Sequence, residues 1–192
     1  MSEKITDKTE ALAAVKEGGD GYVLEHVSDE LKADKEVVMA VVKVNGHALQ
    51  HASDELRADK EVVMAAVKEG IHALEYASDE LKADKEVLMA AVRKQGDALQ
   101  YASDELKADK ELVMAAVEQD YQGHNLEHAS DELKADKEVV MVAVRKAGHA
   151  LEHASDELKA DKEVVMVAVK DVPYALNFAS DELQNDPEIL EG

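Results

Sequence analysis

The sequence predicts an all-α protein: an α-solenoid of about seven repeats of 25 residues, with two helices in each. The tetrad Ser-Asp-Glu-Leu recurs every 25 residues, except for one step of 27, at Ser28, Ser53, Ser78, Ser103, Ser130, Ser155 and Ser180. An apolar run rich in Val, Met and Ala follows each of the first six tetrads, and a glycine or proline separates it from a second apolar group. Self-similarity at this period is typical of stacked repeats, in which each unit buries its apolar surface against its neighbours.

These repeats organise the chain into one expected repeat domain, residues 1–192. Residues 1–27 form a degenerate N-terminal cap, in which Glu10 and Ala11 stand where a full repeat has Val62 and Val63. Polar or small residues suit a terminal repeat, because one of its faces is exposed to solvent. Six repeats follow over residues 28–179, and residues 180–192 begin a truncated C-terminal repeat.

The first helix of each repeat is predicted from a cap and an apolar run. Asp59 is placed to cap a helix of about ten residues, with Glu61 in its first turn and the apolar residues 62–67 behind it. These apolar residues are consecutive, which indicates a short helix with neighbours on several sides. A buried strand, as in leucine-rich repeats, is the alternative, but Ala65 and Ala66 and the absence of a leucine ladder favour the helix.

The second helix is predicted between a glycine and the next tetrad. The first helix should end near Asn45-Gly46 and at equivalent sites, because glycine readily adopts the left-handed conformation that terminates helices. The equivalent sites are Gly70, Gln95-Gly96, Gly123, Ala147-Gly148 and, with proline instead, Pro173. The second helix then begins near His47 and buries Ala48, Leu49, Ala52 and Leu56. Ser53 lies either inside this helix or at the cap of a separate short turn; the sequence leaves both open.

Composition excludes several classes of function. The net charge is −21, and one repeat such as residues 53–77 holds six acidic against three basic residues. Such a field repels nucleic-acid phosphates and anionic membranes, so neither is an expected partner. There is no cysteine, so disulfides, thiolate metal sites and cysteine catalysis are excluded. We see no signal peptide and no apolar run of the roughly 20 residues that a transmembrane helix needs, and expect a soluble intracellular protein.

Two adjoining repeats carry a family resemblance. The segments DKEVVMAAVKEGIHALEYASDELKAD and DKEVLMAAVRKQGDALQYASDELKAD resemble the tandem repeats of the family named domain of unknown function 4116, in the spacing of DKEV, AAVK, AL and ASDEL. The likeness extends over nearly the whole chain, and is weak over residues 7–27. It implies tandem α-helical repeats and brings no activity or ligand with it. The near-identity of the copies is consistent with recent duplication or with deliberate consensus building.

All eight histidines fall in two columns of the repeat, which we name the ring columns. The first column contains Tyr22, His47, His72, Asp97, His124, His149 and Tyr174. The second, four residues later, contains His26, His51, Tyr76, Tyr101, His128, His153 and Phe178. A spacing of four residues puts both columns on one face of an α-helix. The candidate binding face therefore comprises His47, His51, His72, Tyr76, Asp97, Tyr101, Tyr121, His124, His128, His149, His153, Tyr174 and Phe178.

Metal binding is one interpretation of these columns, and ring packing is the other. Pairs four residues apart offer two imidazoles to Zn²⁺, Cu²⁺ or Ni²⁺, at His47 and His51, His124 and His128, and His149 and His153. A third ligand from a neighbouring repeat would be needed. Replacement by Tyr and Phe within the columns favours packing rings over ligands, so we predict no metal site and no cofactor. Titration of the histidines near pH ~6.5 is a further hypothesis, with an effect on stacking or on partner affinity.

Catalysis is not expected, because an active site needs an asymmetric set of residues, whereas the polar residues here repeat in equivalent places. The acidic run lacks the alternating acids and central glycine of a calcium loop, and the methionine column is expected to fill the core. Two loops break the pattern, at residues 18–21 and at 118–123 with Tyr121. Each is read either as a binding loop or as a neutral insertion.

Three functions follow from these observations. The leading hypothesis is a non-enzymatic scaffold that binds a protein partner, without a small-molecule substrate, through the residues that vary between repeats. The second is head-to-tail self-association into a structural filament, motivated by the incomplete last repeat. The third is a metal or pH sensor built on the histidines.

Overall fold

The computed structural model describes residues 4–17 and 21–191. Its contacts divide the chain into two compact units, Met1–Val87 and Leu88–Gly192. Unit 1 contains α1 (Lys8–Lys16), α2 (Val23–His26), α3 (Asp29–Lys32), α4 (Lys35–Val42), η1 (Gly46–His51), α5 (Asp54–Arg57), α6 (Lys60–Glu69), η2 (Ile71–Tyr76) and α7 (Asp79–Lys82). The division falls within α8 (Lys85–Lys94). The expectation of a single domain stays a prediction.

Unit 2 repeats the same order of elements. It contains η3 (Gly96–Tyr101), α9 (Asp104–Lys107), α10 (Lys110–Glu118), η4 (Asn125–His128), α11 (Asp131–Lys134), α12 (Lys137–Lys146), η5 (Gly148–His153), α13 (Asp156–Lys159), α14 (Lys162–Asp171), η6 (Pro173–Phe178), α15 (Asp181–Gln184) and α16 (Pro187–Glu191). The prediction of an all-α repeat solenoid is confirmed, and no strand occurs in the described residues beyond the isolated bridge between Ile5 and Val27.

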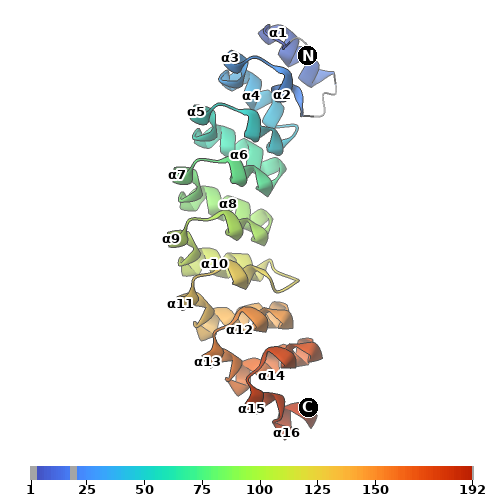
Figure 1. The fold of residues 1–192 in the computed structure, drawn as a ribbon, viewed down its shortest axis with the longest axis vertical. Helices are drawn as coiled ribbons and strands as arrows, with labels where there is room; N and C mark the ends of the chain where they lie inside the picture. The colour runs from blue at the N-terminus through green and yellow to red at the C-terminus, as the bar shows by residue number, and fades with distance from the viewer. Residues whose placement is uncertain (1–3, 18–20, 192) are drawn as a thin grey trace. The chain divides into compact units, whose positions relative to one another are not determined.

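Each full repeat contains three helical segments rather than two. The long α-helix is followed by a 3₁₀ helix and then by a four-residue α-helix (Figure 1). The open question about Ser53 is settled by the third segment: its Oγ accepts a hydrogen bond from the backbone N–H of Leu56 at 3.4 Å and caps α5. Ser53 therefore ends one segment and starts another, which breaks the predicted second helix in two.

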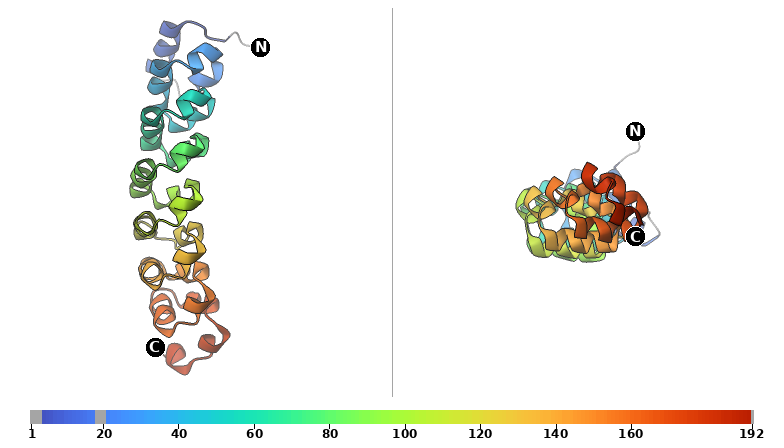
Figure 2. Two further views of the ribbon diagram at one scale, coloured as in Figure 1. Left: turned by 90° about the vertical axis from the view of Figure 1, so that its left-hand side faces the viewer. Right: turned by 90° about the horizontal axis from the view of Figure 1, so that it is seen from below.

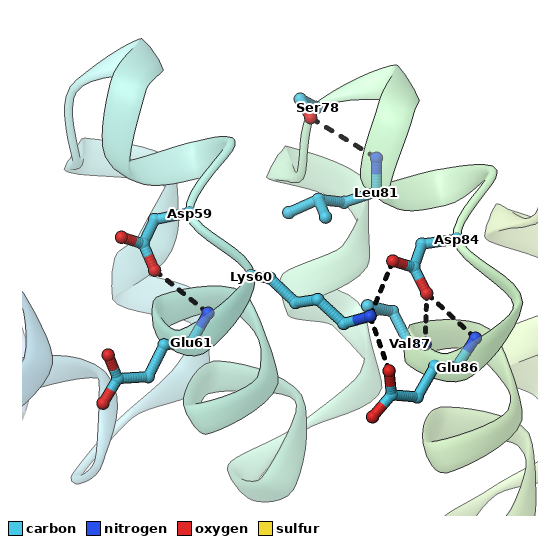
Figure 3. Close-up of polar contacts among 8 residues, drawn as sticks. All are labelled: Asp59, Lys60, Glu61, Ser78, Leu81, Asp84, Glu86 and Val87. Carbon is cyan, nitrogen blue, oxygen red and sulfur yellow. Dashed lines mark hydrogen bonds and ion pairs between the residues drawn. The ribbon is translucent and has the colours of Figure 1, made fainter.

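The long helices begin as the sequence predicts. Asp59 Oδ1 accepts the backbone N–H group of Glu61 at 3.0 Å (Figure 3). It also accepts that of Val62 at 3.2 Å, and both donors have no partner inside the helix. The same cap starts α4, α12 and α14. This local chemistry fixes the first residue of the helix at Lys60.

The core lies between the long helices and the 3₁₀ helices. In α6, Val62, Val63, Ala66 and Val67 are buried, because the helix packs against α4, η1 and η2 within unit 1. In unit 2, α12 packs likewise against α10, α14 and η5. Within each unit the long helices form one layer and the 3₁₀ helices a second (Figure 2). Several neighbours explain why consecutive apolar residues are needed.

The methionine column borders this core. Its first four members are half-buried, Met141 is 8% exposed and Met166 is 41% exposed. Val and Leu fill the seams between helices, and Met covers their edge. Among the described residues, no helix combines the length and the apolar character needed to cross a membrane.

Glycine marks the predicted helix ends for a different reason from the one we expected. Gly46, Gly70, Gly96 and Gly148 do not adopt positive φ, and Gly70 is extended, with φ −163°. A Cβ atom on Gly46 would lie 2.2 Å from the carbonyl oxygen of Ala66 in the next long helix. Gly148 meets its next long helix in the same way, at 2.4 Å. At these four glycines the prediction of left-handed helix caps is wrong, and Gly46 and Gly148 instead allow successive repeats to approach closely. Gly123 does have a positive φ, but it lies beyond the end of α10.

Candidate binding face

The two ring columns lie at opposite ends of the 3₁₀ helices and differ in burial. His47 follows the first residue of η1 and is exposed, whereas His51 ends η1 and is half-buried. A 3₁₀ helix has about three residues per turn, so side chains four apart diverge by about 120°. The columns therefore do not have the α-helical spacing that the expected single face assumed, and that face stays a prediction. The first column is mostly exposed, reaching 51% at Tyr22 and 60% at Tyr174, and the second is mostly half-buried.

Ring contacts run mainly between successive repeats. In unit 1, the rings of His47 and Tyr76 meet edge to face at 5.1 Å, and the Tyr76 hydroxyl lies 3.4 Å from His47 Nε2. In unit 2, His124 and His153 are 6.4 Å apart, and His149 and Tyr174 are 6.1 Å apart. A further pair, Tyr174 and Phe178, meets within η6 at 5.6 Å. The rings pack against one another, which is the packing role weighed from the sequence.

The metal hypothesis requires at least three ligands close together. No group of three His, Asp or Glu side chains in residues 4–17 and 21–191 is placed to hold a metal ion. Burial lowers the pKa of His51, His128 and His153, so these second-column imidazoles are held neutral more firmly than an exposed histidine.

Unit 2 has a depression on its ring-bearing side, which we name the acidic depression. It has a volume of about 480 Å³ and is lined by Asp97, Gln100, His124, Asn125, Glu127, His128, Glu152 and His153. The carboxylates of Asp97, Glu127 and Glu152 are exposed and form no ion pair within the described chain. Three unpaired negative charges therefore surround three imidazole rings. Of the predicted site residues, Asp97, His124, His128 and His153 are brought together here.

The loop at residues 118–123 is held by a buried carboxylate. Asp120 is 6% exposed and accepts backbone N–H groups from Gln122 at 2.9 Å, Gly123 at 2.7 Å and Asn125 at 2.6 Å. Gly123 has φ +88°, a conformation that favours glycine. The insertion is therefore an ordered turn with its own internal support. The other predicted loop, residues 18–21, lies mostly outside the described residues.

This turn presents Tyr121 and positions Asn125. Tyr121 is 78% exposed, and the ammonium of Lys146 lies 5.8 Å from the centre of its ring. Asn125 is 1% exposed and donates from Nδ2 to the carbonyl oxygen of Ala116 at 2.9 Å. The sequence reasoning missed Asp120 and Asn125. The available signal was Asn125 itself, which replaces the small apolar residue found at this point in the other repeats.

The constant tripeptide Asp-Lys-Glu links neighbouring repeats, which the sequence reasoning also missed. Lys60 Nζ lies 2.7 Å from Asp84 Oδ2 and 2.7 Å from Glu86 Oε2 of the next repeat (Figure 3). Asp84 Oδ1 at the same time accepts the backbone N–H groups that start α8, at 2.9 and 3.2 Å. The hydrogen bond from Lys60 is the main cause that lowers the pKa of Asp84, and it raises the pKa of Lys60. The same contacts recur at Lys8, Lys35, Lys110, Lys137 and Lys162.

The tetrad Ser-Asp-Glu-Leu also links neighbouring repeats, through backbone hydrogen bonds. The N–H of Ser53 donates to the carbonyl oxygen of Lys32 in the preceding repeat, and the N–H of Ser78 donates to that of Arg57, both at 3.0 Å. Leu56 and Leu81 are buried beneath these turns. The short helices α3, α5 and α7 follow one edge of unit 1 (Figure 1). The constant residues thus form contacts both within a repeat and between neighbouring repeats.

Comparison with known proteins gives a family and no further relative. A family model described as a domain of unknown function, DUF4116, matches residues 7–57, 34–82, 59–107, 84–123, 109–159 and 161–191. These matches tile the chain as tandem copies, in agreement with the helical repeats. No curated protein and no solved structure matches the chain. The chain therefore belongs to the DUF4116 family.

Proposed function

We propose that the protein is a non-enzymatic helical-repeat scaffold that binds a protein partner through its ring columns. The observation that carries this proposal is that the constant and the varying residues of the repeat have different roles. The constant polar residues, such as Asp84 and Lys60, are engaged in caps and ion pairs between repeats. The residues that vary lie in the 3₁₀ helices, in α2 and in the loop 118–123, where Tyr22, Tyr121 and Tyr174 are more than half exposed. Exposed aromatic residues on a rigid framework are typical of protein-binding surfaces.

The repeated framework also supports a binding role over catalysis. A catalytic site needs a nucleophile or base with a pKa suited to its task and a partner that orients it. The pKa values that depart from their usual range belong mainly to the ion pairs between repeats and to half-buried imidazoles, and burial accounts for the latter. A repeat framework that recurs at each step is suited to contacting an extended partner at several points.

Selection from a random peptide library tests the proposal. The full chain is immobilised beside a ring variant, His124→Ser/His153→Ser/Tyr174→Ser, and beside a control variant, Glu55→Gln/Glu80→Gln, changed at exposed positions of the short helices. We expect a converged family of peptides that binds the wild-type chain and the control but not the ring variant. Peptides that bind all three chains equally, or no converged family at all, would contradict the proposal. Circular dichroism checks that both variants remain folded.

A further inference from the structure

We propose that the acidic depression of unit 2 is a binding subsite for the guanidinium group of an arginine side chain on a basic partner segment. This inference deepens the scaffold function above and rests on it. It identifies the chemistry of the partner and the place where its side chain would bind.

Charge is the first ground for this assignment. Asp97, Glu127 and Glu152 surround the depression and form no ion pair in the described chain. The carboxylates of the Asp-Lys-Glu tripeptides differ, since Asp161 and Glu163 are neutralised by Lys137 at 2.7 and 2.8 Å. Asp97 also stands where the neighbouring repeats place a histidine in the first ring column. A cation is the group that this depression lacks.

A free acceptor oxygen is the second, independent ground. Asn125 is 1% exposed and lines the depression, and its Nδ2 is committed to the carbonyl oxygen of Ala116. No described residue donates to its Oδ1, and no fully buried side-chain polar atom of the described residues lacks a partner. Asn125 thus brings to the lining of the depression an acceptor oxygen that no described residue uses. Gly96 leaves the room for this side chain, since a Cβ there would lie 2.1 Å from Asn125 Nδ2.

The rings select arginine among possible cations. His124 and His153 are 6.4 Å apart and both line the depression. A guanidinium is planar, stacks on flat rings and carries five N–H donors in a fixed fork, which fits several carboxylate and amide oxygens together. A lysine ammonium is a compact and strongly hydrated charge, and it gains less from rings.

Nuclear magnetic resonance of the histidine rings tests the site in the full chain, with acetyl-arginine amide as the probe. We expect saturable shifts at His124, His128 and His153, while His26, His47 and His51 of unit 1 serve as internal controls and stay unmoved. Acetyl-citrulline amide, which has nearly the same shape but no charge, should cause no shift. Acetyl-lysine amide, with a free side-chain ammonium, should bind several-fold more weakly. Equal shifts with citrulline or lysine, or equal shifts in both units, would overturn the proposal.

Paired variants sharpen the test. Glu127→Gln/Glu152→Gln should weaken the binding of acetyl-arginine amide by about three- to tenfold, because exposed ion pairs contribute modestly to affinity. Glu25→Gln, at the equivalent position of the first repeat, should leave the affinity unchanged. An unchanged affinity in the double variant would contradict the assignment. Selection of peptides on the ring columns without any response to arginine would remove this inference alone, and arginine binding without peptide selection would remove the scaffold function.

Discussion

The ring-bearing sides of the two units are built on one repeat and present different chemistry. In unit 1, His47 and Tyr76 meet at 5.1 Å, so two polar side chains satisfy one another. In unit 2, the corresponding positions are Asp97 and His128, and both line the acidic depression. The caps and ion pairs beneath are the same in both units. Side chains on the 3₁₀ layer can therefore differ between repeats while the framework stays the same.

The insertion loop is where the units should differ most in stability. Asp120→Ala removes three backbone hydrogen bonds to a buried carboxylate, and should lower the free energy of unfolding by about 2–4 kcal/mol, because the N–H groups of Gln122, Gly123 and Asn125 lose their acceptor. The matched change in unit 1 is Asn45→Ala, which removes one bond, to the N–H of His47 at 3.0 Å, and should cost about 1 kcal/mol.

Urea denaturation followed by circular dichroism measures both losses. Hydrogen exchange then assigns each loss to a unit, since repeat proteins unfold through neighbouring repeats rather than always as a whole. Protection should fall in residues 88–192 for Asp120→Ala. Equal losses for the two variants would show that the carboxylate of Asp120 does not support its turn.

Mild acid should separate the units through their second-column histidines. Burial lowers the pKa of His128 and His153 in unit 2 and of His51 in unit 1, so the folded chain prefers each imidazole neutral. An unfolded histidine titrates near pH ~6.5, so below that pH the unfolded chain binds protons that the folded chain resists. The free energy of unfolding therefore falls as the pH drops through ~6.5, and levels off once the folded imidazoles are protonated.

The charged groups around these rings are mixed. Glu127 and Asp97 raise the pKa of His128, whereas Lys107 and Lys134 lower it, and burial outweighs them all. Denaturation curves at about pH 7.5 and 5.5 measure the loss. We expect His128→Gln/His153→Gln to flatten this dependence more than His51→Gln does. A dependence that is unchanged in both variants would assign it to other groups.

The units can also be made alike. Asp97→His/His128→Tyr transfers the His47 and Tyr76 pair of unit 1 into unit 2, where a ring contact should form across the acidic depression. We expect acetyl-arginine amide to bind about threefold more weakly, because one carboxylate is lost and the space is filled. Thermal unfolding should change little, since both positions lie outside the core. Unchanged affinity, measured by the histidine shifts, would show that the depression does not depend on Asp97.

Local chemistry explains what the sequence predicted correctly. Asp59 caps α6 because its carboxylate reaches N–H groups two and three residues away, and the buried residues of α6 follow from their apolar character. The 3₁₀ helices were not predicted, because the apolar residues Ala48, Ala52 and Leu56 are four residues apart, which is the spacing expected on one face of an α-helix. The backbone is extended at Ala52, and the N–H of Ser53 donates to the carbonyl oxygen of Lys32 in the preceding repeat, a contact that the sequence alone does not reveal.

Contacts between repeats explain what the sequence did not predict. The site of Gly46 was found, but its role depends on the distance to Ala66 in the next long helix. The contact of Lys60 with Asp84 likewise requires the stacking distance, although its 24-residue spacing is visible in the chain. The ring columns were read directly from the sequence. The acidic depression was not, because it depends on the 3₁₀ geometry and on how Asp120 turns the chain toward Asn125.

The smallest expected effect concerns the ion pairs shared by both units. Lys60→Met in unit 1 and Lys137→Met in unit 2 each remove two contacts of 2.7–2.8 Å, yet these side chains are more than 40% exposed, so solvent and salt screen the pairs. Each variant should lower the melting temperature slightly and by the same amount, and about 1 M NaCl should reduce the difference from wild type. A much larger loss from one lysine than from the other would mean that the framework differs between the units, and that the ring columns are not the only place where they diverge.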